Sequence, residues 1–219
     1  MVVNHGTRVN KDGVKTPHTL PGYVLGLLPH PDKLFKDVSG LVSCEVGDKV
    51  ACIRDMSSNN IIFLQDSYSA RPTLQQVDKK YVIRSEKGNS LYCVAPVVAG
   101  SVCFAFSCGV KGEGSVLQAS ENACYMHPND IYLRGALSTP QVNVDTVNTY
   151  LLQRHEGMNW EYRVNGEDIP LAPNVVEWEG LYLGGGPYAS SCEFDLYALV
   201  VCLHVSSFYL TSLENYFKE

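Results

Sequence analysis

The sequence has 219 residues, of which 45% are hydrophobic, and its formal net charge at pH 7 is −6. A chain of this size and composition can bury the core of one large all-β domain, so we expect a single domain. Its acidic balance, with no dense run of Lys and Arg, argues against nucleic acid as a partner.

The first 21 residues are polar, contain Gly6, Gly13, Pro17 and Pro21, and show no hydrophobic periodicity. This composition predicts either a disordered tail or an extended N-terminal arm at 1–21 that attaches the domain to a larger assembly. We expect the arm, followed by one domain at 22–219.

No apolar segment follows a basic one at the N-terminus, so we expect no signal peptide and synthesis in a cytoplasm. We also expect no membrane insertion, because no stretch approaches the roughly 20 apolar residues of a spanning helix. The cysteines are scattered through apolar runs without a CxxC pair, which predicts reduced, buried thiols and no structural zinc. They are Cys44, Cys52, Cys93, Cys103, Cys108, Cys124, Cys192 and Cys202.

Turn residues dominate 22–80, and the short β-prone segments 50–53 and 61–64 lie between them. The aspartates of these turns, Asp32, Asp37, Asp48 and Asp55, are too widely spread for a calcium loop. We therefore expect them to form turns, and we predict no metal and no cofactor. From residue 81 to 134, turn residues separate β-prone runs at intervals of about 8 to 14 residues, the spacing typical of a sandwich or jelly roll.

The last third of the chain predicts its elements most clearly. Large apolar and polar residues alternate over Trp160–Val164, and Asn165-Gly166 then gives a strong hairpin signal. A short strand at 181–183 is stopped by glycines, and Phe194–Cys202 reads as a central strand buried on both faces. Residues 210–218 predict a short helix with a capping box formed by Thr211 and Glu214. The predicted fold is all-β, an antiparallel two-sheet β-sandwich with a short C-terminal helix.

Five motifs, in order, resemble the concanavalin A-like lectin/glucanase superfamily in the laminin-G-like form common in phage structural proteins and bacterial surface proteins. They are 47–60 with Ala70-Arg71-Pro72-Thr73-Leu74, the strand 101–106, Tyr162-Arg163-Val164-Asn165-Gly166, Leu181-Tyr182-Leu183-Gly184-Gly185, and 194–202 with 210–217. The chain departs from the family pattern where Ile53 replaces a tryptophan and where Ser58 and Asn60 replace two turn glycines. Asn tolerates the left-handed backbone that glycine would adopt there.

The resemblance implies a jelly roll over 22–219 and recognition of sugars by loop aromatics together with Asp or Asn side chains. The candidate ligand-binding residues in or beside predicted loops are Tyr125, His127, Asn129, Asp130, Trp178 and Tyr188.

Two catalytic alternatives remain open. Glu193 and Asp195 have the two-residue spacing of glucanase carboxylates, but a third acid is missing and the strand is otherwise apolar. Cys108 lies in a segment superficially like the nucleophile turn of cysteine proteases, with His127 downstream, although His5 and His18 lie in the predicted arm. We expect no catalytic residues and no enzyme activity.

The hypothesis favoured by the sequence is a non-enzymatic virion structural protein, such as a phage decoration or tail-fibre protein. It would contact other virion subunits through the N-terminal arm, and it would bind a glycan or a neighbouring subunit. The alternatives are a glucanase-like enzyme using Glu193 and Asp195, and an intracellular structural interaction domain without a sugar site.

Overall fold

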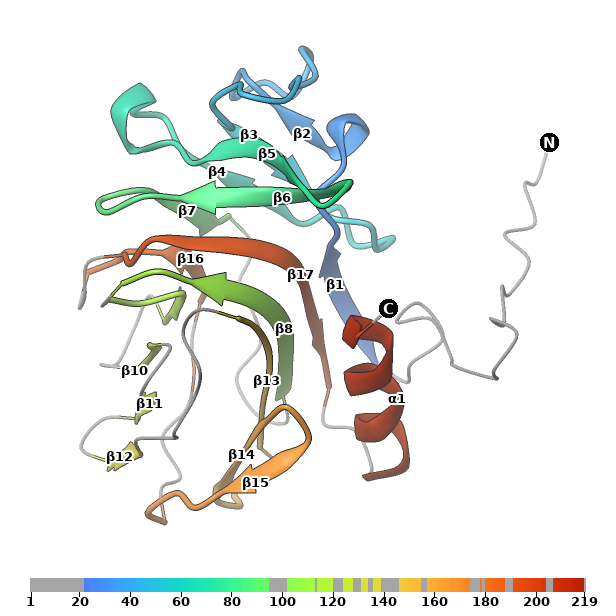
Figure 1. The fold of residues 1–219 in the computed structure, drawn as a ribbon, viewed down its shortest axis with the longest axis vertical. Helices are drawn as coiled ribbons and strands as arrows, with labels where there is room; N and C mark the ends of the chain where they lie inside the picture. Colours follow the sequence, from blue (N-terminus) through green and yellow to red (C-terminus); the bar gives the residue numbers. More distant parts are fainter. Residues whose placement is uncertain are drawn as a thin grey trace, which may run out of the picture.

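Two antiparallel β-sheets and one helix make up the described part of the chain in a computed structural model (Figure 1). The structure describes residues 22–94, 102–112, 114–119, 124–127, 131–133, 136–138, 146–154, 157–173, 178, 180–187, 191–203 and 207–218. The prediction of an all-β sandwich with a short C-terminal helix is confirmed. The proposed arm at 1–21 lies outside the described residues and stays a prediction.

Sheet A, with eight described strands, runs in the order β15-β14-β13-β8-β17-β6-β5, and β1 pairs with β17. Its strands are β1 (Tyr23–Leu27), β5 (Thr73–Val77), β6 (Lys80–Ser85), β8 (Val102–Val110), β13 (Val147–Arg154), β14 (Trp160–Val164), β15 (Glu167–Ile169) and β17 (Phe194–Cys202). As the sequence predicts, β17 is a central strand buried on both faces.

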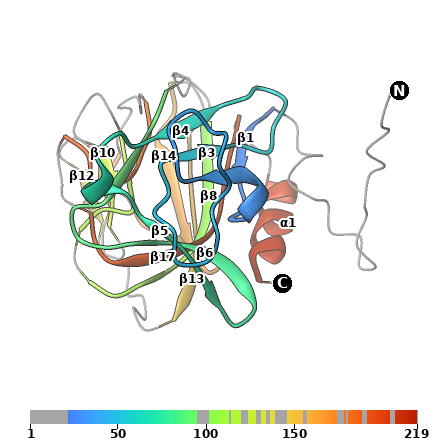
Figure 2. The same ribbon diagram turned by 90° about the horizontal axis from the view of Figure 1, so that it is seen from above.

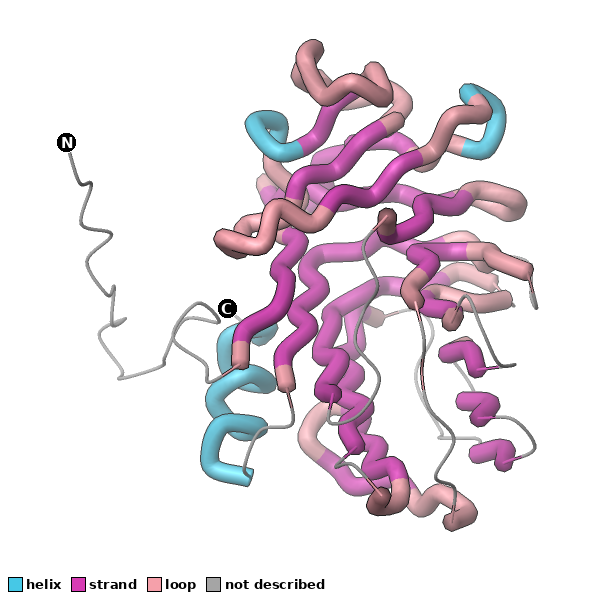
Figure 3. The backbone as a smooth tube through the Cα atoms, turned by 180° about the vertical axis from the view of Figure 1, so that it is seen from behind, coloured by secondary structure: helices cyan, strands magenta, loops and turns pink. Residues whose placement is uncertain are grey.

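Sheet B, with nine described strands, runs in the order β12-β11-β10-β9-β16-β7-β4-β3-β2. Its strands are β2 (Leu34–Phe35), β3 (Cys52–Arg54), β4 (Ile62–Leu64), β7 (Ser90–Cys93), β9 (Leu117–Gln118), β10 (Cys124–Met126), β11 (Ile131–Leu133), β12 (Ala136–Ser138) and β16 (Tyr182–Gly184). Two short 3-10 turns lie at η2 (Pro31–Lys33) and η3 (Tyr68–Ala70). The helix α1 (Ser207–Lys218) and the short strands β10–β12 lie on opposite sides of the molecule, as Figures 2 and 3 show from above and from behind.

The apolar interior lies between the two sheets because alternate side chains of each strand point inward. Trp178 belongs to this interior. Its ring is 1% exposed and packs against Phe104 and Trp160, with centroid separations of 5.0 and 6.3 Å, while its indole N–H donates to the carbonyl of Gly180 at 3.1 Å. Trp178 lies outside the strands, as the sequence predicts, but the core encloses its ring, so it is not available to stack on a sugar.

The turn chemistry read from the sequence is present in the structure. Asn165 and Gly166 have φ of 53° and 92°, and they connect β14 to β15. Asn60 has φ of 53°, so asparagine does adopt the left-handed backbone at the turn where the sequence pattern that it resembles has glycine.

Aspartate carboxylates hold the turns of the N-terminal third. The Asp37 carboxylate accepts hydrogen bonds from the Ser39 hydroxyl and from the backbone N–H groups of Leu41 and Val42, which lower the pKa of Asp37 to about 2. The buried Asp55 accepts in the same way from Ser57 and from the N–H of Ile61. These contacts support the prediction that the aspartates form turns.

The C-terminal helix begins three residues earlier than the sequence predicts, at Ser207 instead of residue 210. The predicted capping box is therefore wrong, because Thr211 lies inside the helix. Glu214 is 4% exposed and its Oε1 lies 3.3 Å from Nη1 of Arg163 on β14. This acid anchors the helix to sheet A and does not cap the helix.

We expect Trp178→Ala to lower the free energy of unfolding by about 3–5 kcal/mol, because it leaves a cavity between the sheets. Tyr68→Ala is a matched control, since Tyr68 is 69% exposed, and should cost under about 1 kcal/mol. Urea denaturation followed by tryptophan fluorescence and circular dichroism measures both. Equal stability of the two variants would contradict the placement of Trp178 in the core.

Candidate functional site

The outward face of sheet A changes from apolar to polar along β8. Phe104, Phe106 and Cys108 point into the core, so the alternate residues Cys103, Ala105 and Ser107 point outward. The helix α1 covers Cys103 and Ala105 with Leu210 and Leu213. At Ser107 the apolar cover ends and a polar cleft begins.

This cleft has a volume of about 480 Å³, within the usual range of small-ligand sites. It lies across the end of sheet A, between the β5–β6 turn, the β14–β15 turn and the end of α1. The lining residues are Val77, Asp78, Lys80, Ser107, Thr146, Val147, Asn148, Thr149, Asn165, Tyr197 and Phe217.

Two hydroxyl residues on neighbouring strands line the cleft. Ser107 of β8 is the register partner of Thr149 of β13, and the two residues are 2% and 6% exposed. Because both residues line the cleft, their hydroxyls are placed to form hydrogen bonds with a ligand or with ordered water.

One side of the cleft is held rigid by side-chain amides. The Asn165 Oδ1 accepts from the backbone N–H of Thr149 at 2.9 Å, and its Nδ2 donates to the Asn148 Oδ1 at 2.8 Å. The Asn148 Nδ2 in turn donates to the carbonyl of Thr146 at 3.1 Å. Each contact fixes the orientation of the next group, so this side is preorganised for recognition.

Tyr197 reaches the cleft through an irregularity in the sheet. Leu196 pairs with Cys108 while Ala198 pairs with Ser107, so Tyr197 is an extra residue on β17, a β-bulge. Bulges re-aim side chains, and this one brings a partly exposed phenol into the cleft. Burial, and then the nearby Asp195 carboxylate, raise the pKa of Tyr197, so the phenol is neutral and can donate a hydrogen bond at pH 7.

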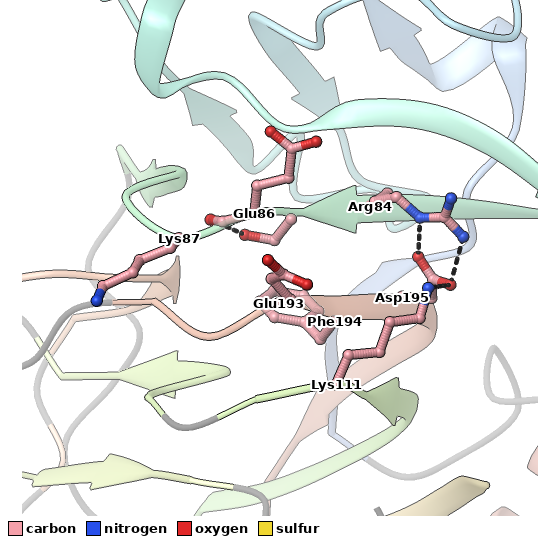
Figure 4. A pocket seen from close by; sticks show the side chains of 8 residues that line it. Arg84, Glu86, Lys87, Lys111, Glu193, Phe194 and Asp195 are labelled. Atoms are coloured by element: carbon pink, nitrogen blue, oxygen red, sulfur yellow. Dashed lines mark hydrogen bonds and ion pairs between the residues drawn. The ribbon is translucent and has the colours of Figure 1, made fainter. Parts of the chain in front are cut away.

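A second, smaller hollow of about 280 Å³ lies at the start of β17 and carries mainly charged groups (Figure 4). Asp195, 5% exposed, accepts from Nε and Nη2 of Arg84, both at 2.7 Å, and its Oδ2 lies 3.7 Å from the Lys111 ammonium. The Asp195 carboxylate raises the pKa of Arg84. We call this hollow the charged notch; its lining residues are Arg84, Ser85, Glu86, Lys87, Lys111, Glu193, Phe194 and Asp195.

The charged notch contains both carboxylates of the glucanase alternative. Glu193 and Asp195 line it together, and Glu193 is exposed just before β17. A retaining mechanism needs one of the two carboxylates as a nucleophile, but both Asp195 oxygens are engaged by cations. The geometry therefore favours a structural ion pair that ties β6 to β17.

The environment of Cys108 argues against the cysteine-protease alternative. Cys108 is fully buried in β8, and burial raises the pKa of its thiol well above the ordinary value. A nucleophilic cysteine needs the opposite environment, one that lowers the thiol pKa and leaves the sulfur accessible.

The three sequence-predicted ligand residues that the structure describes do not line the polar cleft. Tyr125 of β10 and the adjacent His127 are half-buried on sheet B and stack on each other at 4.6 Å between ring centroids. Trp178 is in the core, while Asn129, Asp130 and Tyr188 lie outside the described residues.

The residues of the polar cleft could not be predicted from the sequence, because strand pairing brings them together. Ser107 and Thr149 are single small polar residues within apolar strands, and only the strand register brings them side by side. The one local signal was Asn165-Gly166, which marked the turn at the cleft's edge.

Among the residues that the structure describes, no group of three or more His, Cys, Asp or Glu side chains could hold a metal ion. Within the same residues, no helix has the length and apolar character needed to cross a bilayer.

No protein-family model and no curated protein sequence matches the chain. Many solved structures share its architecture, and three of them serve as examples. A Trypanosoma rangeli sialidase in complex with 2,3-difluoro-KDN has a TM-score of 0.60 and 13% identity, over 97% of this chain and 35% of the sialidase. The binding domain of Paraclostridial Mosquitocidal Protein 1 has a TM-score of 0.58 and 10% identity, over 90% of this chain and 52% of that domain.

The third structure is the ligand-binding domain of botulinum neurotoxin serotype D in complex with N-acetylneuraminic acid, with a TM-score of 0.56 and 9% identity, over 90% of this chain and 50% of that domain. The chain has the concanavalin A-like lectin/glucanase fold. It is a lectin-like β-sandwich that spans between about a third and about half of the proteins it matches.

We expect Asp195→Asn to lower the free energy of unfolding by about 1–3 kcal/mol, because Arg84 loses the ionised half of a largely buried pair. Glu193→Gln, at an exposed position in the same notch, should change it by less than about 0.5 kcal/mol. Chemical denaturation of both variants measures the difference. A stable Asp195→Asn variant would contradict the structural role of this ion pair.

Proposed function

We propose that this chain is a non-catalytic, glycan-binding domain and that the polar cleft of sheet A holds the sugar. The observation that carries the proposal is the pair of nearly buried hydroxyls, Ser107 and Thr149, beside an oriented amide and the Tyr197 phenol. Sugars offer many hydroxyl groups and apolar ring faces, so a site for them combines hydrogen-bonding groups with aromatic surface.

The lining of the cleft also supports the non-catalytic part of the proposal. Asp78 supplies the one carboxylate among its described lining residues, whereas the usual glycosidase mechanisms use two. The charge of Lys80, at the start of β6 on the same side of the cleft, offsets that of Asp78. A neutral or weakly charged sugar therefore suits the cleft better than a strongly anionic one.

The structural relatives give further support of a general kind. One contains N-acetylneuraminic acid and another is a sialidase, so the architecture occurs in proteins that handle sugars. The chain covers only half or less of each, so the position and identity of those ligands are not transferred to it.

We also propose that the domain works within a larger assembly, as a virion decoration or tail-fibre component attached through residues 1–21. This placement rests on the laminin-G-like sequence resemblance and on the composition of the arm. Removing residues 1–21 should then abolish incorporation into particles while leaving glycan binding intact. Particles that incorporate the truncated chain normally would contradict this part of the proposal.

A glycan array followed by calorimetry tests the central claim. We expect saturable binding of a neutral glycan, weakened about three- to tenfold in Thr149→Val through the loss of one hydrogen bond, and more strongly in Tyr197→Ala. Glu193→Gln is the control and should bind as the unmodified chain does.

Three outcomes separate the alternatives. Hydrolysis of a polysaccharide that is lost in Glu193→Gln would establish the glucanase alternative and overturn the proposal. No saturable binding to any glycan would leave a structural interaction domain. Binding that is unaffected by Thr149→Val and Tyr197→Ala would place the sugar elsewhere on the sandwich.

A further inference from the structure

Two cysteines face each other across the centre of sheet A. Cys103 of β8 and Cys202 of β17 are direct register partners in an antiparallel pair. Such partners have Cα atoms about 4.5–5.5 Å apart, which falls within the range of about 4.4–6.8 Å that a disulfide requires. The Cys202 side chain raises the pKa of the Cys103 thiol, as expected for two neighbouring thiols.

This relationship is specific to these two thiols. Among the described residues, no other cysteine has a cysteine as its register partner. Cys103 and Cys202 also share a single environment, the small apolar cluster between sheet A and α1, where both are 0% exposed.

We propose that Cys103 and Cys202 form a disulfide site, which closes when α1 lifts from sheet A in the presence of a low-molecular-weight disulfide such as oxidised glutathione. One cysteine thiolate attacks the small disulfide, releasing one glutathione thiolate and leaving a mixed disulfide on the protein. The second thiolate then attacks that mixed disulfide and releases the second glutathione. The protein loses two protons and two electrons, and the oxidant is reduced to two thiols.

The helix acts as the gate for this reaction. Leu210 and Leu213 of α1 cover the two thiols, so an oxidant reaches them only when the helix opens locally. The neighbouring Cys202 side chain, and then burial, raise the pKa of Cys103 well above the ordinary value, so the Cys103 thiol is unreactive in the closed state.

The crosslink would act on the strands that shape the polar cleft. Ser107 lies on β8 and Tyr197 lies on β17, on the same two strands as the cysteines. A covalent bond between these strands limits how far they separate when the chain unfolds, and it closes a loop of nearly half the chain. The disulfide forms by the same chemistry whether or not the cleft holds a ligand.

The test uses the full chain, incubated with oxidised glutathione at pH 8 and then digested without reduction for mass-spectrometric mapping. We expect a linked peptide containing Cys103 and Cys202, the loss of two titratable thiols, and a Tm higher by roughly 10 °C that reducing agent reverses. Leu213→Ala, which weakens the docking of α1, should speed the reaction several-fold without changing the linked pair.

Two cysteine variants serve as controls. Cys93→Ser removes a partly exposed thiol and should leave the crosslink intact, whereas Cys202→Ser should abolish both the linked peptide and the reversible rise in Tm. If Cys202→Ser fails to fold, the peptide map of the unmodified chain decides alone. Cys103 and Cys202 recovered as free thiols, or linked to other cysteines, would overturn the inference.

Discussion

The pairing of β8 with β17 is the constraint on which the rest of the molecule depends. Each strand has nine residues, and together they form the centre of sheet A, flanked by β13 and β6. Their inward side chains build the common core with sheet B, while their outward side chains decide what can lie on the other face. That outward face is apolar under α1, polar at Ser107 and charged at Asp195.

Because this face has apolar, polar and charged regions, it can hold the helix α1, the polar cleft and an ion pair side by side. The helix needs small apolar residues beneath it, which Cys103, Ala105 and Cys202 supply. The ion pair between Arg84 and Asp195 fixes β17 against β6 at the far end of the strand. Between these two anchors, the bulge at Tyr197 interrupts the regular pairing and opens room for the polar cleft.

The sequence predicted those features that depend on neighbouring residues. The alternation over Trp160–Val164, the turn at Asn165-Gly166 and the apolar run Phe194–Cys202 are each present in the structure, because strand periodicity and turn chemistry act locally. The fold class followed from their order along the chain.

The candidate site depended on pairings that no local pattern reveals. Ser107 lies beside Thr149 only because of the register between β8 and β13. Tyr197 enters the cleft only because one extra residue on β17 interrupts the register between β17 and β8. Trp178 does lie outside the strands, but its exposure was misjudged, because tertiary packing encloses a ring that its polar sequence neighbours suggest is accessible. The predicted start of α1 was wrong because Thr211 and Glu214 have the spacing of a capping box. In the structure both residues lie inside the helix, and Glu214 pairs with Arg163 of β14.

The most direct test of the central claim is a backbone amide NMR titration of the isotopically labelled chain with a glycan identified by array screening. The account predicts that the largest chemical-shift changes cluster at Ser107, Thr149, Asn165 and Tyr197, on the outward face of sheet A. Changes that cluster instead around Tyr125 and His127 on sheet B, with the cleft residues unaffected, would contradict it.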